Sequence, residues 1–282
     1  MSAQQPHTEQ QRVDEQRVEQ PNGPGVDRHA ALDSGPPLSR WETTLRMGLG
    51  VGILGVGGVF WLLTLLLLLP FRRLRTQVSN VWVRPIARSI LLLTKSRYLV
   101  EGRAHLTVAR QTQRPVLFVS NHSSLLDIII AAWLAPLGTI TVGKKEILRY
   151  PLVGWLFALS GCLAVDRKHP RQAAQAVLDL GETVKKHPVH VFFWPEGTRL
   201  ANGRPKRFKK GFVRLALLGG FDIVPIVVEG AHLAWPNRTL QLCPTTVRIV
   251  VHPVVRTSDW QMATLSHHVE EVFTYFRAAN SS

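Results

Sequence analysis

An uncharged apolar stretch of 23 residues, 47–69, is the feature that most constrains how this chain can fold. As a helix with a rise of about 1.5 Å per residue, it matches the hydrocarbon core of a bilayer, which is about 30 Å thick. A secretory signal peptide would be shorter, nearer the N-terminus and followed by a small-residue cleavage site, whereas the basic run PFRR follows here. The stretch therefore predicts a transmembrane or membrane-embedded helix over residues 47–69.

Glycines at positions 50, 52 and 55 of this stretch match the GxGxxG pattern of dinucleotide-binding loops. That pattern indicates a nucleotide site only between a strand and a helix, and here it lies inside an apolar run. We interpret these glycines, together with Gly48, as positions where another helix can approach closely.

The segments on either side of the stretch differ in composition. Residues 1–46 are polar and Gln-rich, with five Arg, no Lys and seven acids, which predicts a disordered tail. Residues 70–97 carry seven cations and no acid. They predict a basic amphipathic interfacial segment, with the arginines of residues 81–93 among lipid headgroups.

Charge asymmetry predicts the orientation in the membrane. Cations close to a membrane segment are retained in the cytoplasm, so we expect the domain that follows this stretch to lie on the cytoplasmic face of the membrane. A span would place residues 1–46 outside, whereas insertion into one leaflet would keep them inside. The length favours the span, although six of the first twelve residues are glycines that lower its hydrophobicity.

The remainder, residues 98–282, has the pattern of an α/β domain. Strands alternate with helices, which predicts a mixed, mostly parallel sheet covered by helices and preceded by the N-terminal membrane helix. The β-rich runs are 116–119, 189–193, 223–228 and 247–251, and the helical patterns are 170–186 and 210–218.

The charge balance restricts the partners of the chain. There are 34 Lys and Arg against 19 Asp and Glu, a formal net charge of +15, which indicates an anionic partner. Two cysteines without a CxxC motif exclude a disulfide framework or a cysteine zinc site. The basic run at 204–214 has only Phe208 and Phe212 for base stacking, so we expect no nucleic-acid partner.

His122 and Asp127 are candidate acid–base residues in NHSSLLD, directly after a predicted strand. In a regular helix, side chains five residues apart diverge by about 140°, so the two can meet only if His122 precedes the helix. A carboxylate that accepts from one ring nitrogen would leave the other nitrogen to take a proton from a hydroxyl. A structural histidine that caps a turn is the alternative.

A second cluster, PEGTR, follows the predicted strand at 189–193. Pro and Gly interrupt the strand and predict a turn. Arg199 in that turn has the planar donor fork that matches a phosphate group. Further cations follow at Arg204, Lys206, Arg207, Lys209, Lys210 and Arg214.

Five sequence blocks in order resemble the glycerolipid acyltransferases, in particular the 1-acyl-glycerol-3-phosphate acyltransferase type. They lie within about residues 100–230, and Gly143 and Trp194 depart from the family pattern, which has Ala and Phe there. The blocks are NHSSLLD at 121–127, VGKKE with PLVG at 142–154, GCLAVDR at 161–167, FWPEGTR at 193–199 and IVPIV at 223–227.

The resemblance implies a membrane-bound enzyme of phospholipid biosynthesis, whose catalytic domain we expect on the cytoplasmic face of the inner or plasma membrane of a bacterium. It would move a fatty acyl group from acyl-CoA or acyl carrier protein to the free hydroxyl of lysophosphatidic acid, which gives phosphatidic acid. It implies His122 as the general base and Asp127 as its orienting partner, with no metal and no resident cofactor. The implied substrate-binding residues are Asn121, Lys144, Arg167, Glu196, Gly197, Thr198 and Arg199.

Two alternatives stay open at this point. The acceptor could be another lyso-lipid, such as a lyso-ornithine lipid. The chain could also be a non-catalytic, membrane-tethered protein that binds an anionic ligand. The intact His122 and Asp127 pair favours an enzyme, since a binding protein has no need of a general base.

Overall fold

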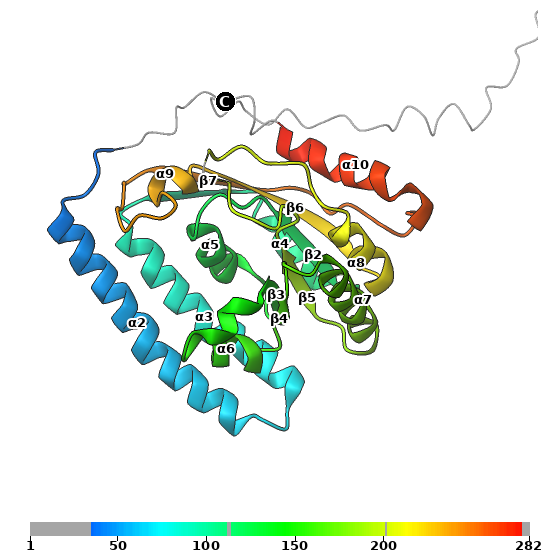
Figure 1. Ribbon diagram of the computed structural model, residues 1–282, viewed down its shortest axis with the longest axis horizontal. Coiled ribbons are helices and arrows are strands. Elements are labelled where there is room, and N and C mark those ends of the chain that lie inside the picture. Colours follow the sequence, from blue (N-terminus) through cyan, green and yellow to red (C-terminus); the bar gives the residue numbers. More distant parts are fainter. Residues whose placement is uncertain (1–34, 112–113, 201, 278–282) are drawn as a thin grey trace, which may run out of the picture. The chain divides into compact units, whose positions relative to one another are not determined.

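Residues 35–111, 114–200 and 202–277 are described by the computed structural model, within a unit that runs from Leu32 to Ser282. The tail predicted for residues 1–46 lies outside the described residues up to position 34. Its remainder is ordered, because the Leu38 N–H donates to the Leu242 carbonyl at 3.0 Å and helix α2 begins at Arg40. The helices are α2 (Arg40–Leu67), α3 (Arg72–Leu93), α4 (Ala104–Gln111), α5 (Leu126–Leu134), η1 (Lys145–Arg149), α6 (Val153–Leu159), α7 (Pro170–Lys186), α8 (Gly211–Gly219), α9 (Ala231–Ala234), η2 (Met262–Thr264) and α10 (Leu265–Arg277) (Figure 1). The strands are β1 (Arg97–Glu101), β2 (Val116–Ser120), β3 (Thr139–Lys144), β4 (Leu163–Val165), β5 (His190–Phe193), β6 (Asp222–Glu229) and β7 (Thr246–Val251).

The seven strands form one mixed, mostly parallel sheet in the order β1-β7-β6-β2-β5-β3-β4. Strands β6, β2, β5, β3 and β4 are parallel to their neighbours in this series, and the β6–β7 pair is antiparallel. The predicted α/β fold with a mostly parallel sheet is thus confirmed.

Helices cover both faces of the sheet, because its central strands are apolar on both sides. Leu117 and Val119 of β2 pack into a core with helices α7, α8 and α10. Val116 and Phe118 of the same strand pack into a second core with α4, α5 and α9. This two-sided burial matches the unbroken apolar runs of the predicted strands.

Helix α2 begins seven residues before the predicted membrane stretch. Ser39 caps it, because the Ser39 Oγ accepts from the Glu42 N–H at 3.2 Å, and the carboxylate of Glu42 lies favourably in the first turn. The helix ends at Leu67 rather than Leu69. Pro70 disfavours the helical conformation of the preceding residue and has no N–H to donate.

The glycines of α2 divide into packed and unpacked positions. A Cβ at Gly48, Gly52 or Gly55 would meet nothing within 4 Å, so close helix packing at these three positions is a wrong prediction. The close approaches occur instead where a Cβ on Gly57 would meet Ile86 and one on Gly58 would meet Leu152, each at 3.0 Å. The GxGxxG pattern lies wholly inside α2 and forms no nucleotide-binding turn.

Helix α3 is continuous from Arg72 to Leu93, with Pro85 inside it, and it lies within the predicted amphipathic segment 70–97. The Arg84 Nη2 donates to the carbonyl oxygen of Ala135, the C-cap residue of α5, at 2.6 Å. The cation there offsets the negative end of the α5 dipole. Arg84 is thus half-buried and bonded within the protein, whereas Arg88 is exposed, and the placement of these arginines among lipid headgroups stays a prediction.

Polar side chains fasten α3 to the sheet. The side-chain amide of Asn80 donates to the Thr139 carbonyl at 3.1 Å and accepts from the Thr139 N–H at 3.0 Å. The Arg75 Nη1 donates to the carbonyl of Leu159 at the end of α6, at 3.1 Å. Because these bonds reach β3 and α6, α3 is part of the same folded unit as the sheet.

Candidate active site

The predicted site residues gather at one edge of the sheet. Strands β2, β5, β3 and β4 are parallel neighbours, so their carboxyl ends meet there, which is where ligands of α/β proteins bind. His122 follows β2, the turn 195–199 follows β5, Lys144 ends β3 and Arg167 follows β4. Residues from four separate blocks of the sequence are thereby brought to the same side of the molecule.

His122 and Asp127 form a buried hydrogen-bonded pair. The His122 Nδ1 lies 3.0 Å from the Asp127 Oδ2, and the two residues are 7% and 2% exposed. Regular helix α5 begins only at Leu126, so His122 precedes it, as the spacing requires. The predicted meeting of the two side chains is confirmed.

The Asp127 carboxylate is held by the chain that leads into α5. Its Oδ2 also accepts from the backbone N–H groups of Ser123, at 2.5 Å, and Ser124, at 2.8 Å. These two N–H groups fix the orientation of the carboxylate, whose Oδ2 faces the Nδ1 of His122. When Nδ1 carries a proton and donates it to this oxygen, the ring's Nε2 is the atom that can accept a proton.

Trp194 covers one side of His122, with ring centroids 5.1 Å apart at an angle of 31°. Trp194 is 7% exposed, so it excludes water from that side of the imidazole. Sequence comparison with the family pattern marks Trp194 as a departure but assigns it no role. Its contact with His122 depends on the pairing of β5 with β2, which the motif does not reveal.

The loop between β2 and α5 is fixed by distant segments. The side-chain amide of Asn121 exchanges two hydrogen bonds of 2.8 Å with the backbone of Val228 in β6. The Asn237 Nδ2 donates to the Ser123 carbonyl at 2.7 Å, and the Leu200 N–H donates to the His122 carbonyl at 2.9 Å. Asn121 thus positions the loop through β6, whereas the sequence predicted it to bind substrate.

The turn after β5 depends on Gly197 and Arg167. Gly197 has φ +72°, a conformation that L-residues with a Cβ rarely adopt. The Arg167 Nη1 donates to the Gly197 carbonyl at 2.6 Å, so the loop after β4 supports the turn after β5. Thr198 and Arg199 follow Gly197 in the turn and are exposed. Lys144 at the end of β3 is exposed as well. Among the described residues, the guanidinium of Arg199 has no hydrogen-bond or acidic partner, so it is available to an external anion.

Asp166 is a site-forming residue that the sequence analysis did not single out. It forms an ion pair with Lys145 and a hydrogen bond of 2.7 Å with the Nδ1 of His169, and the hydrogen bonds from these two side chains hold its pKa well below the usual range. These contacts order the turn that presents Arg167. The Asp-Arg pair in GCLAVDR was visible in the sequence, but the partners of Asp166 were not.

Glu196 is buried beside the pair, at 4% exposure. Among the described residues, neither carboxyl oxygen has a hydrogen bond of good geometry, although the backbones of His122 and Lys206 approach the carboxyl group. Burial raises the pKa of Glu196 from 4.5 to about 8, and the negative charge of Asp127 adds to the effect. Glu196 is therefore mostly protonated at neutral pH, so it shapes the turn as a neutral side chain rather than as an anion.

This raised pKa predicts a pH-dependent stability. The folded state holds the Glu196 proton more tightly than the unfolded state, so the stabilisation is complete below about pH 4.5 and lost as the pH rises through about 8. We expect the unfolding temperature of the wild type to fall relative to that of Glu196→Gln between these two pH values. A constant difference between the two proteins across that range would contradict the raised pKa.

Comparison with known proteins identifies the family. The Acyltransferase family model matches residues 97–229. The 1-acyl-sn-glycerol-3-phosphate acyltransferase of Limnanthes alba is 33% identical over 217 residues, which cover 77% of this chain and 75% of that protein. The chain belongs to the acyltransferase family. The resemblance found in the five sequence blocks is thereby confirmed.

Other relatives of this acyltransferase carry the same name. The 1-acyl-sn-glycerol-3-phosphate acyltransferase of Cocos nucifera is 32% identical over 77% of this chain and 69% of that protein. The one from Pseudomonas aeruginosa is 30% identical, over 67% of this chain and 70% of that protein. The crystal structure of the 1-acyl-sn-glycerophosphate (LPA) acyltransferase from Thermotoga maritima has the same fold. It has a TM-score of 0.69 at 22% identity, over 85% of this chain and 94% of that one.

Proposed function

We propose that this acyltransferase moves a fatty acyl group from an acyl thioester to the free hydroxyl of 1-acyl-glycerol-3-phosphate, which gives phosphatidic acid. The observation that carries the proposal is the buried His122–Asp127 pair beside the exposed Arg199 turn, at one edge of the sheet. Relatives that cover most of the chain are named for this acceptor, which supports the choice of lyso-lipid.

In the proposed reaction, the Nε2 of His122 removes the proton of the acceptor hydroxyl as its oxygen attacks the thioester carbonyl carbon. Asp127 stabilises the imidazolium that forms, because its Oδ2 already accepts from Nδ1. The tetrahedral intermediate then expels the thiolate, which takes the proton back from His122. The acceptor supplies the attacking oxygen, so no nucleophilic side chain is required.

Cations around the pair suit the phosphate of the acceptor. Arg199 offers a planar donor fork, and Lys144 adds a point charge at the end of the neighbouring β3. We assign the acceptor phosphate to Arg199. Arg167 is assigned a supporting role through the Gly197 carbonyl, and Thr198 lies next to Arg199 in the same turn.

Replacement of Arg199 tests the phosphate assignment. We expect Arg199→Ala to raise the acceptor KM about ten- to a hundredfold, because a charge-assisted hydrogen bond is lost. The KM of the acyl donor should change little. Arg199→Lys should recover only part of the loss, because a point charge replaces the fork. An unchanged acceptor KM in steady-state kinetics would move phosphate binding to Lys144 or to the run 204–210.

Substrate identity is tested with the full chain in detergent. Lysophosphatidic acid is offered with acyl-CoA or with acyl carrier protein, and phosphatidic acid is measured. Competition with a lyso-ornithine lipid tests the acceptor, because that lipid has no phosphate for Arg199 to hold. Acylation of lyso-ornithine lipid in preference to lysophosphatidic acid would overturn the proposed acceptor.

We propose that α2 attaches the enzyme to one leaflet of the membrane. Among the described helices, α2 alone is long and apolar enough to cross a bilayer. However, Trp61 and Leu65 of α2 pack in one cluster with Ile86 of α3 and Leu156 of α6. A spanning α2 would draw these partners, with the arginines of α3, into hydrocarbon at high cost. The contacts therefore favour insertion into one leaflet, although the length alone favoured a span.

This arrangement predicts the location of both chain ends. With the catalytic domain on the cytoplasmic face, reporter fusions before Trp41 and after Ser282 should both report an internal location. The seven cations of residues 70–97 retain that side in the cytoplasm. An external signal before Trp41 would select the span, and an external signal at Ser282 would contradict the cytoplasmic assignment.

A further inference from the structure

A cavity of about 370 Å³ opens between the start of α3 and the end of α7. Its volume lies within the range of ligand pockets, about 300–1,000 Å³. The apolar wall includes Ile140 of β3, Leu180 and Val184 of α7, and Val189 just before β5. Thr76 of α3 and Thr183 of α7 also line it. We call it the α3–α7 cavity.

The α3–α7 cavity is separate from the active site. It reaches β3 at Ile140, near the amino end of the strand, whereas Lys144 ends that strand at the catalytic edge. Ile140 and Lys144 are four residues apart along the strand, which is a distance of about 13 Å. Neither His122 nor any residue of the 195–199 turn lines the cavity.

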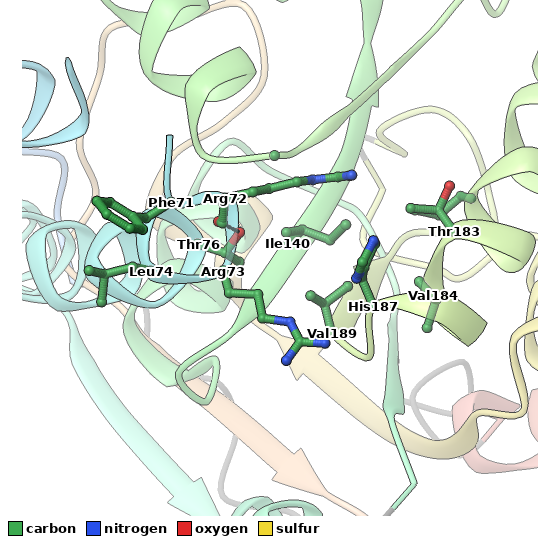
Figure 2. A pocket seen from close by; sticks show the side chains of 12 residues that line it. Phe71, Arg72, Arg73, Leu74, Thr76, Ile140, Thr183, Val184, His187 and Val189 are labelled. Carbon is green, nitrogen blue, oxygen red and sulfur yellow. Dashed lines mark hydrogen bonds between the residues drawn. The ribbon is translucent and has the colours of Figure 1, made fainter. Parts of the chain in front are cut away.

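Cations collect at the mouth of the cavity. Figure 2 shows the side chains of Arg72 and Arg73 extending from α3 toward His187 at the end of α7. No acidic residue lines the cavity, and among the described residues neither arginine has an acidic partner. Glu182, the acid nearest in sequence to His187, pairs with Lys185 at 3.2 Å. The mouth is therefore complementary to an anion.

The first turn of α3 carries positive charge, whereas a helix N-terminus favours negative charge. The first turn carries Arg72 and Arg73 and no acid, and Phe71 provides no side-chain cap. Cations at a helix N-terminus are unfavourable against the macrodipole. When unfavourable charges at a helix end are not offset by other groups of the chain, they often have a function. An external anion would offset the charges of Arg72 and Arg73.

Apolar residues beside the mouth indicate a lipid rather than a free anion. Leu67, Leu69 and Phe71 are all exposed, and they continue the apolar surface of α2, the helix that we assign to the membrane. A ligand that enters from the membrane would have an apolar chain for the wall and an anionic head for the arginines.

We propose that the α3–α7 cavity binds one acyl chain of an anionic glycerophospholipid, with its phosphate between Arg72, Arg73 and His187. The lipid could come from the bilayer or could be the phosphatidic acid that the enzyme makes, since both carry this chemistry. The proposal does not depend on the catalytic roles of His122 and Arg199.

The test measures lipids that stay bound to the full chain in detergent, by native mass spectrometry. Dioleoyl phosphatidylglycerol, dioleoyl phosphatidic acid and dioleoyl phosphatidylcholine are offered separately. We expect one tightly retained molecule of either anionic lipid and at least about tenfold weaker retention of phosphatidylcholine. A clear preference for phosphatidic acid over phosphatidylglycerol would assign the site to the product, and equal retention would assign it to bilayer lipid.

Two variants locate the bound lipid. Arg72→Gln with Arg73→Gln should weaken retention at least about tenfold, whereas the control Arg88→Gln with Arg171→Gln, two exposed arginines outside the cavity, should not. Thr183→Trp should fill the cavity and displace the chain, while Thr183→Ser should leave it open. An unchanged unfolding temperature shows that a variant folds. Retention that is equal for all three lipids, or unaffected by both the glutamine pair and Thr183→Trp, would overturn the proposal.

Discussion

Replacement of His122 by alanine is expected to lower the turnover number for acyl transfer about 10²- to 10⁴-fold, the usual contribution of a positioned general base. The physical reason is the loss of Nε2, which Asp127 holds ready to accept a proton. The measurement is the initial rate of phosphatidic acid formation at saturating acceptor and donor. Folding and membrane attachment should be unchanged, since the loop backbone is held by Asn121 and Leu200 independently of the ring.

A matched control for this variant is His267→Ala, because His267 is exposed on α10 and lies outside the site. It should retain wild-type turnover. If His122→Ala keeps more than about a tenth of the wild-type turnover, the assignment of His122 as base is wrong. Equal losses in both variants would point to general damage to the domain rather than to lost chemistry.

Replacement of Asp127 by asparagine is expected to lower turnover by at least about 10²-fold, with little change in the acceptor KM. Asparagine retains an oxygen for the N–H groups of Ser123 and Ser124 but loses the negative charge that stabilises the imidazolium. It also no longer favours the tautomer with the proton on Nδ1. A lower turnover number with an unchanged acceptor KM indicates the loss of this charge, whereas a disordered loop would also raise the acceptor KM.

The control for this second variant is Asp179→Asn on the exposed side of α7, which should behave as the wild type. The unfolding temperatures of both variants should be compared with that of the wild type. A loss of turnover accompanied by an equally large rise in acceptor KM would indicate that Asp127 acts only by ordering the loop. Wild-type turnover in Asp127→Asn would remove it from the mechanism.

Much of the fold could be predicted because its central strands are continuous apolar runs. The expected strands correspond to β2, β5, β6 and β7, and the expected helices to α7 and α8. Strands β1, β3 and β4 lacked a comparable signal. β4 has only three residues, and β1 is half-buried along most of its length, so neither shows a clear periodicity. Only part of helix α3 was predicted as a helix. Pro85 and the arginines interrupt the apolar pattern of its sequence, and polar side chains bond it to the rest of the fold.

The site could be predicted in its chemistry but less well in its geometry. The spacing of His122 and Asp127 predicted that the two side chains can meet if His122 precedes the helix, and the start of α5 at Leu126 meets that condition. The structural partners of Asn121 and Arg84 could not be predicted, since each side chain is bonded to a backbone group far away in sequence. Trp194 and Asp166 were visible in the motifs, but their partners were not.

The sequence by itself determined the acyltransferase family, the α/β class, the His122–Asp127 pair and the apolar character of α2, because these follow from local runs and short spacings. Only the tertiary structure decided which edge of the sheet unites His122 with the 195–199 turn, and which side chains hold the loops there. It also decided that α2 packs on α3 and α6, and that a cationic cavity opens between α3 and α7. These features join residues that lie tens of positions or more apart, and only the strand order and the helix docking bring such residues into contact.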